Sequence, residues 1–79
     1  MQPGAPRPSF EEIYARSFHL VCRYLRASGA PMSELEDLAQ EVFLVVQRKL
    51  PQFDGANLSG WLYRIAALTV RDHRRRAWF

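Results

Sequence analysis

The sequence predicts an all-α fold, a compact bundle of three main helices, on three observations. Apolar residues recur at helical spacing in three separate segments. No segment sustains the alternation of apolar and polar residues that is typical of a strand. Hydrophobic residues make up 48% of the 79 residues, which is enough for a packed core in one small domain.

The first helix is predicted to begin at Ser9, after a lead of residues 1–8 whose three prolines and one glycine should keep it flexible. Ser9 and Glu12 have the spacing of a capping box, in which each side chain bonds the backbone of the other. Gly29 suits the position after the helix, and Pro31 prevents continuation. The expected buried positions are Phe10, Tyr14, Phe18, Val21 and Leu25.

The second helix is predicted to start at another capping-box pattern, Ser33 with Glu36, and to end at about Leu50, before Pro51. Its expected buried positions are Leu35, Leu38, Val42, Val46 and Leu50. A different surface of this helix carries polar residues and one leucine: Asp37, Gln40, Glu41 and Leu44. This surface is either a solvated acidic face or a docking patch for a partner helix, with the leucine as its anchor.

The third helix is predicted to run from near Ser59 to about Arg76, with Asn57 or Ser59 as its cap. Its expected buried positions are Leu62, Ile65, Ala66 and Thr69. The opposite side carries a narrow stripe of Arg64, Arg71 and Arg75, with Arg74 beside it. Such a helix suits a polyanion, because one side anchors it and the other meets phosphate. Favourable charge at a helix C-terminus and a membrane-surface helix are the alternatives.

The loop before the third helix is polar and ends on a large aromatic residue. Its residues are Asp54, Gly55, Ala56, Asn57, Leu58, Ser59 and Gly60, followed by Trp61. These groups can hold one extruded base beside a cationic helix, which is what a single-stranded nucleic-acid site needs. The alternative is an ordinary turn in which Trp61 packs as a core residue.

Charge is polarised along the chain, whose net charge is +3 and whose pI is about 9.6. Acidic residues gather in residues 34–41 and arginines in residues 64–76, which indicates two different partners. One cysteine, Cys22, allows no internal disulfide, and two histidines are too few for a usual metal site. The pattern also lacks a catalytic arrangement, so neither an enzyme nor a cofactor is expected.

The amino-acid sequence shows neither a membrane-spanning segment nor an export signal. No apolar run approaches the ~18 residues of a transmembrane span, so no membrane insertion is expected. The N-terminus also lacks the charged-then-apolar pattern of a signal peptide. A reducing, cytoplasmic setting is therefore the expectation.

Four segments together resemble region 2 of the bacterial sigma-70 family, in its extracytoplasmic function (ECF) group. The segments are Glu36–Leu44, Arg48–Gly55, Trp61–Ala66 and Arg71–Arg75. The resemblance covers Phe10 to Arg76, nearly all of the predicted domain at residues 9–77, and the order of several motifs makes it specific. It implies a helical domain that binds core RNA polymerase and helps to open the promoter −10 element.

The resemblance assigns residues to two surfaces. The polymerase-binding surface, which would dock on the β′ clamp helices, consists of Asp37, Gln40, Glu41, Leu44 and Arg48. The surface for the non-template strand consists of Asp54, Gly55, Ala56, Asn57, Leu58, Ser59, Trp61, Arg64, Arg71, Arg74 and Arg75. An anti-sigma factor is a further candidate partner.

The sequence departs from the family pattern mainly on the DNA side. Ala67 and Leu68 stand where family members commonly carry a basic residue and an asparagine, and the loop lacks its usual cation. The alternative is therefore a sigma-like interaction module that binds polymerase or an anti-sigma factor without melting DNA. The family's second helical domain, which binds the −35 element, is not expected in this chain.

Overall fold

Three α-helices form the fold over residues 8–77, the part of the chain that this computed structural model describes. In order, the elements are α1 (Phe10–Ala27), the 3-10 turn η1 (Met32–Glu34), α2 (Leu35–Lys49), the 3-10 turn η2 (Leu50–Gln52) and α3 (Leu58–Ala77). No strand occurs within residues 8–77, so the predicted all-α fold is confirmed. The predicted flexible lead lies outside the described residues, apart from Pro8.

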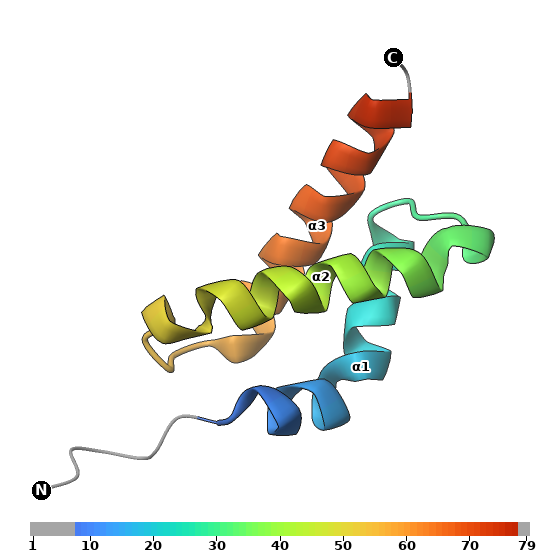
Figure 1. The fold of residues 1–79 in the computed structure, drawn as a ribbon. Helices are drawn as coiled ribbons and strands as arrows, with labels where there is room; N and C mark the ends of the chain where they lie inside the picture. The colour runs from blue at the N-terminus through green and yellow to red at the C-terminus, as the bar shows by residue number, and fades with distance from the viewer. Residues whose placement is uncertain (1–7, 78–79) are drawn as a thin grey trace, which may run out of the picture.

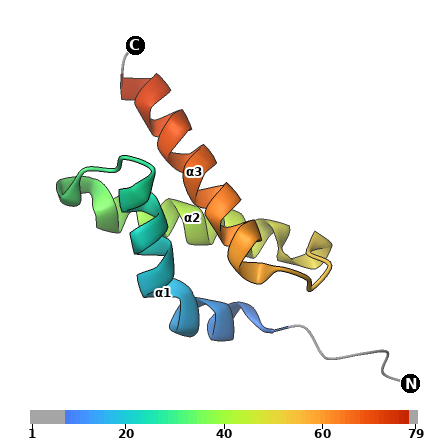
Figure 2. The ribbon, with the colours of Figure 1, turned by 180° about the vertical axis from the view of Figure 1, so that it is seen from behind.

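The helix α2 lies across the pair formed by α1 and α3. Figure 1 shows α2 in front of the other two helices, and Figure 2 shows α1 and α3 in front when the molecule is seen from behind. All three pairs of helices are in contact. The side chains that are completely buried between them include Val21, Leu25, Val42, Val46 and Leu62. None of the helices in residues 8–77 is long and apolar enough to cross a bilayer.

The predicted capping box at the start of α1 is confirmed. The Glu12 amide donates to Ser9 Oγ at 3.1 Å, and the Ser9 amide donates to Glu12 Oε1 at 2.9 Å. The bond from the Ser9 backbone holds the pKa of the Glu12 carboxyl below its usual value, because it favours the charged form. At the other end, Gly29 has a φ of +104° and its amide bonds the Arg26 carbonyl at 3.0 Å, so it follows the helix as predicted.

Replacing Ser9 with alanine should lower the free energy of unfolding by about 1 kcal/mol at neutral pH, because the first turn of α1 loses its acceptor. The pKa of Glu12 is lowered by folding, so the stabilisation from its carboxylate is present above the unfolded pKa and is lost as the pH falls through the folded pKa. Replacing Glu12 with alanine removes this carboxylate, whereas Ser9→Ala keeps the amide that bonds it, so the gap in free energy of unfolding between the wild type and Glu12→Ala should shrink in acid. Urea unfolding at neutral and at acidic pH measures this gap. A gap that widens in acid would contradict the stabilising role of the Glu12 carboxylate.

The predicted buried side of α1 is partly wrong. Ile13 and Ser17 are buried, whereas Tyr14 is 42% exposed and Phe10 and Phe18 are half-buried. The buried residues of α1 follow each other at every fourth position, and the larger aromatic rings flank this row. They pack instead on an aromatic residue of α2, where the ring centroids of Tyr14 and Phe43 are 4.7 Å apart.

The predicted cap of α2 is wrong, because Ser33 lies inside the 3-10 turn η1 and makes no capping bond. The backbone holds this turn, since the Glu34 amide bonds the Pro31 carbonyl at 3.0 Å. Of the predicted positions, Leu38, Val42 and Val46 are buried and Leu35 and Leu50 are half-buried. Ala39 and Phe43 join the core in addition.

Candidate nucleic-acid interface

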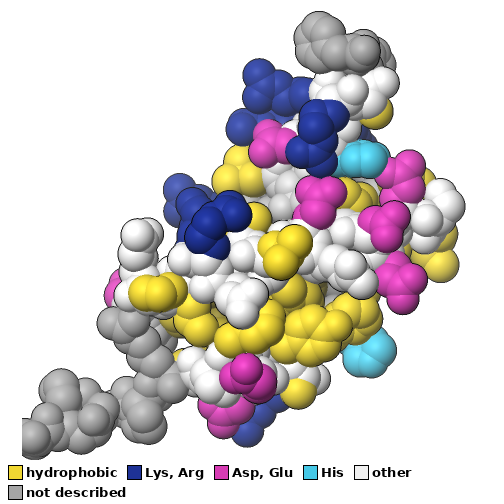
Figure 3. Space-filling model, viewed as in Figure 1, with side chains coloured by type: hydrophobic (Ala, Val, Ile, Leu, Met, Phe, Trp, Pro, Cys, Tyr) yellow, Lys and Arg dark blue, Asp and Glu magenta, His cyan; other side chains and the backbone are white. Residues whose placement is uncertain are grey.

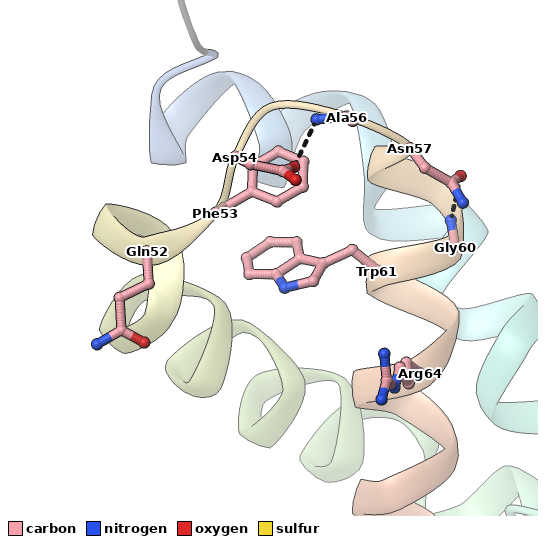
Figure 4. Close-up of a pocket in the computed structure, with 8 residues that line it drawn as sticks. All are labelled: Gln52, Phe53, Asp54, Ala56, Asn57, Gly60, Trp61 and Arg64. Carbon is pink, nitrogen blue, oxygen red and sulfur yellow. Dashed lines mark hydrogen bonds between the residues drawn. The ribbon is translucent and has the colours of Figure 1, made fainter.

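An open pocket of about 380 Å³ lies between η2 and the first turns of α3 (Figure 4). Its walls are Gln52, Phe53, Asp54, Ala56, Asn57, Gly60, Trp61 and Arg64. The structure therefore brings together five of the predicted DNA-binding residues: Asp54, Ala56, Asn57, Trp61 and Arg64. The predicted polar loop therefore forms the rim of a pocket, and Arg64, the first arginine of the stripe, lines the same pocket.

A pair of stacked aromatic rings forms the apolar side of the pocket. The centroids of Phe53 and Trp61 are 4.4 Å apart, and their planes differ by 22°. Phe53 is only 5% exposed and so fixes the position of the half-buried indole beneath it (Figure 4). Sequence reasoning missed Phe53 and Gln52 as pocket residues. The available signal was an aromatic residue immediately before the polar loop, eight positions from Trp61.

Local hydrogen bonds shape the loop at the mouth of the pocket. Asp54 Oδ1 accepts from the Ala56 amide at 2.9 Å, and Asn57 Oδ1 accepts from the Gly60 amide at 3.0 Å. Asn57, with a φ of +50°, is thus the residue that caps α3, one of the two predicted candidates. A Cβ at Gly60 would lie 2.5 Å from Asn57 Nδ2, so this position requires glycine for the cap to form.

Three other predicted loop residues do not line the pocket. The hydroxyl of Ser59 is hydrogen-bonded to that of Tyr24 on α1, and Leu58 is half-buried against the core. Gly55 is exposed at the tip of the loop, with a φ of +90°. Ser59 and Leu58 therefore seat the start of α3 on the bundle, and the pocket is built from the remaining loop residues.

The predicted arginine stripe faces solvent along α3. Arg64, Arg71 and Arg75 are all exposed, and the opposite side of the helix is buried at Leu62, Ile65, Ala66, Thr69 and Val70. At 1.5 Å per residue, Arg71 lies about 10.5 Å along the axis from Arg64, and Arg75 about 6 Å further. Arg71 approaches Asp72 at 3.8 Å with both side chains more than half exposed, so this contact binds it weakly. The stripe thus continues from the pocket toward the end of α3.

Arg74 points away from this stripe and toward the end of α1. A Cβ added at Gly29 would lie 2.0 Å from Arg74 Nη2, so the guanidinium covers this glycine closely. In the same turn, Arg26 Nη1 donates to the Ala30 carbonyl at 2.9 Å. Arg74 is therefore the member of the predicted set whose charge lies at the junction of α1 and α3.

Comparison with known proteins decides the family. The sequence model of the sigma-70 region 2 family matches residues 13–79 of the chain. The chain belongs to the sigma-70 region 2 family. It is 31% identical over 68 residues to the RNA polymerase sigma factor NccH of Alcaligenes xylosoxydans xylosoxydans, which covers 85% of this chain and 37% of that relative.

A second relative of this region 2 domain is the ECF RNA polymerase sigma factor SigE of Mycolicibacterium smegmatis. The two are 31% identical over 72 residues, which covers 91% of this chain and 28% of that relative. The chain thus spans roughly a third of the length of these relatives. No solved structure matches it significantly.

The other predicted surface of this region 2 domain lies on α2. Asp37, Gln40, Leu44 and Arg48 are exposed there, and Leu44 is 61% exposed. Glu41 is half-buried and pairs with Arg76 Nη2 of α3 at 3.2 Å. Figure 3 shows acidic side chains at the N-terminal end of α2 and hydrophobic side chains gathered between α2 and α1.

A shallow apolar hollow of about 250 Å³ adjoins Leu44 on this surface. Its lining residues are Phe10, Tyr14, Gln40, Phe43, Leu44 and Gln47. Sequence reasoning placed Phe10 and Tyr14 in the core and so missed that they extend the surface around Leu44. The exposed leucine is therefore the edge of an apolar patch with a polar and acidic border, which favours a docking surface over a purely solvated face.

Proposed function

We propose that this domain is the polymerase-binding and −10-binding module of an ECF-type RNA polymerase sigma factor. The observation that carries the proposal is the continuity of the pocket with the exposed arginine stripe, because Arg64 belongs to both. Membership of the sigma-70 region 2 family supports it, as do two relatives named as RNA polymerase sigma factors.

The pocket has the size and chemistry to hold one unpaired base. Its volume of about 380 Å³ falls within the range of small-molecule sites. The Trp61 indole offers an aromatic surface for stacking, and Gln52, Asp54 and Asn57 offer polar groups for the base edge. A base of the non-template strand that enters this space has to leave the duplex first.

Binding of this kind favours an open promoter without any chemical step. Unstacking a base pair costs a few kcal/mol, and the cost is met when the protein binds the single strand more tightly than the duplex. The captured base supplies that difference, and contacts of Arg64, Arg71 and Arg75 with the same strand add affinity and hold the strand beside the pocket. The domain therefore acts as a binding protein that shifts an equilibrium, and not as an enzyme.

The α2 surface is the proposed site for core RNA polymerase, through the clamp helices of its β′ subunit. Leu44 and its apolar surroundings serve as the anchor, and Asp37, Gln40 and Arg48 form the polar border. Glu41 contributes to this border while it is paired with Arg76. An anti-sigma factor that covered either surface would block the function, and the cytoplasm is where the domain would meet its partners.

The proposal is tested by mixing the chain with bacterial core RNA polymerase and a random pool of single-stranded DNA, then isolating the complex by gel filtration. We expect the chain to co-elute with the polymerase and to enrich particular strands beyond those that the polymerase retains alone. Failure to co-elute would contradict polymerase binding. Co-elution without any enrichment would favour the alternative, an interaction module that binds polymerase without binding the −10 strand.

A further inference from the structure

Leu68 is an exposed leucine in the middle of the arginine stripe. Its side chain is 44% exposed, although it lies in the third turn of a helix that buries five residues on its other side. At 100° per residue, Trp61, Arg64, Leu68, Arg71 and Arg75 fall within an arc of about 80°. Leu68 is about 6 Å along the axis from Arg64 and about 4.5 Å from Arg71. Any strand that follows the arginines must therefore pass over this leucine.

The position of Leu68 distinguishes it from the other large apolar side chains that are exposed. Tyr14 and Leu44 border the α2 hollow, and Tyr63 packs edge-on against Tyr24, with centroids 5.2 Å apart. A single exposed leucine is ordinary on a protein surface. One that has an arginine four residues before it and another three residues after it is placed where a nucleic-acid strand would cover it.

The chemistry of leucine limits what it can recognise on such a strand. It has no donor or acceptor, so it cannot read the hydrogen-bonding groups of a base edge. A polar base edge pressed on it would lose water without a replacement bond. Thymine is the one DNA base that carries a methyl group, and apolar side chains contact that methyl. An apolar contact at this place therefore favours thymine over the other three bases.

We propose that Leu68 is a specificity-determining residue that contacts the 5-methyl group of a thymine close to the captured base. The inference rests on the proposed binding of the single strand and adds the identity of one nucleotide to it.

The test uses the full chain on beads at low salt, where electrostatic affinity is greatest. Strands are selected from random single-stranded DNA with the wild type, Leu68→Ala and Leu68→Asn. Each thymine of the best wild-type strand is then replaced by deoxyuridine, which removes only the methyl group. We expect one replacement to weaken wild-type binding roughly fourfold, the scale of one buried methyl group. Both variants should be indifferent to that replacement and should lose the thymine preference at that position.

A matched control is Met32→Ala, which shortens an apolar side chain that is 69% exposed on η1 and should leave the methyl effect intact. The inference is wrong if the wild type enriches strands but no thymine methyl affects its binding. It is also wrong if Leu68→Ala still binds the deoxyuridine strand more weakly than the thymine strand. In both cases the proposed binding of single strands stands. If the wild type enriches no strand at all, the proposed function fails and the inference fails with it. Circular dichroism spectra that match the wild type confirm that the variants are folded.

Discussion

Replacing both Arg64 and Arg71 with alanine is expected to weaken binding of single-stranded DNA roughly 25-fold at ~0.1 M salt. Each neutralised phosphate of a single strand contributes about 0.7 to the slope of log affinity against log salt, so two lost contacts remove about 1.4. Between ~1 M salt and ~0.1 M salt the logarithm of the salt concentration changes by about one, so a slope lower by about 1.4 reduces the affinity at ~0.1 M roughly 25-fold. Both side chains are exposed, so the variant should unfold at the same urea concentration as the wild type.

A control for this variant removes the same charge from another helix. Arg16 and Arg23 are exposed on α1, and the double alanine variant lowers the net charge equally. Fluorescence anisotropy with a labelled strand at several salt concentrations measures affinity and slope for all three proteins. If the α1 variant loses as much affinity and slope as the α3 variant, binding follows net charge and the stripe is not a strand-binding surface.

Replacing Gln40 and Leu44 with alanine should weaken binding of core RNA polymerase by about 30-fold or more. Leu44 is the apolar centre of the α2 surface, and truncation of such an anchor commonly costs 2 kcal/mol or more of binding free energy. Gln40 lies one turn before it and lines the same hollow. Because both side chains are exposed, the free energy of unfolding should change little.

This second variant also separates the two surfaces. Its affinity for single-stranded DNA should match that of the wild type, since neither residue lines the pocket or the stripe. Met32→Ala, an equally apolar truncation on η1, should bind polymerase as the wild type does. Unchanged binding of polymerase by the Gln40 and Leu44 variant, measured by surface plasmon resonance, would show that the docking surface lies elsewhere.

The number and order of the helices were predictable because the apolar period and the breakers agree in every segment. Pro31 and Pro51 lie between the helices, and the capping box at Ser9 is satisfied by contacts within four residues. The cap of α2 failed because the pattern at Ser33 does not show that a 3-10 turn already holds this backbone. Such local signals predict a helix end only when no competing turn forms.

Which aromatic residues are buried could not be predicted from periodicity alone. Tyr14 and Ile13 both lie near the apolar side of α1, and the choice between them depends on how closely α2 approaches, which the sequence does not state. The same limit explains Phe53, whose partner Trp61 is brought to it by a loop. Arg74 looked like a neighbour of the stripe, but its contact with Gly29 needs the crossing of α1 and α3.

The central claim is that the pocket and the arginine stripe prefer an unpaired strand to the closed duplex. The most direct measurement takes the strand that the chain enriches from a random pool and compares its dissociation constant alone and annealed to its complement, at one salt concentration. We predict that the single strand binds at least about tenfold more tightly, since the duplex must first release the base that the pocket holds. Equal affinity, or tighter binding of the duplex, would contradict the claim.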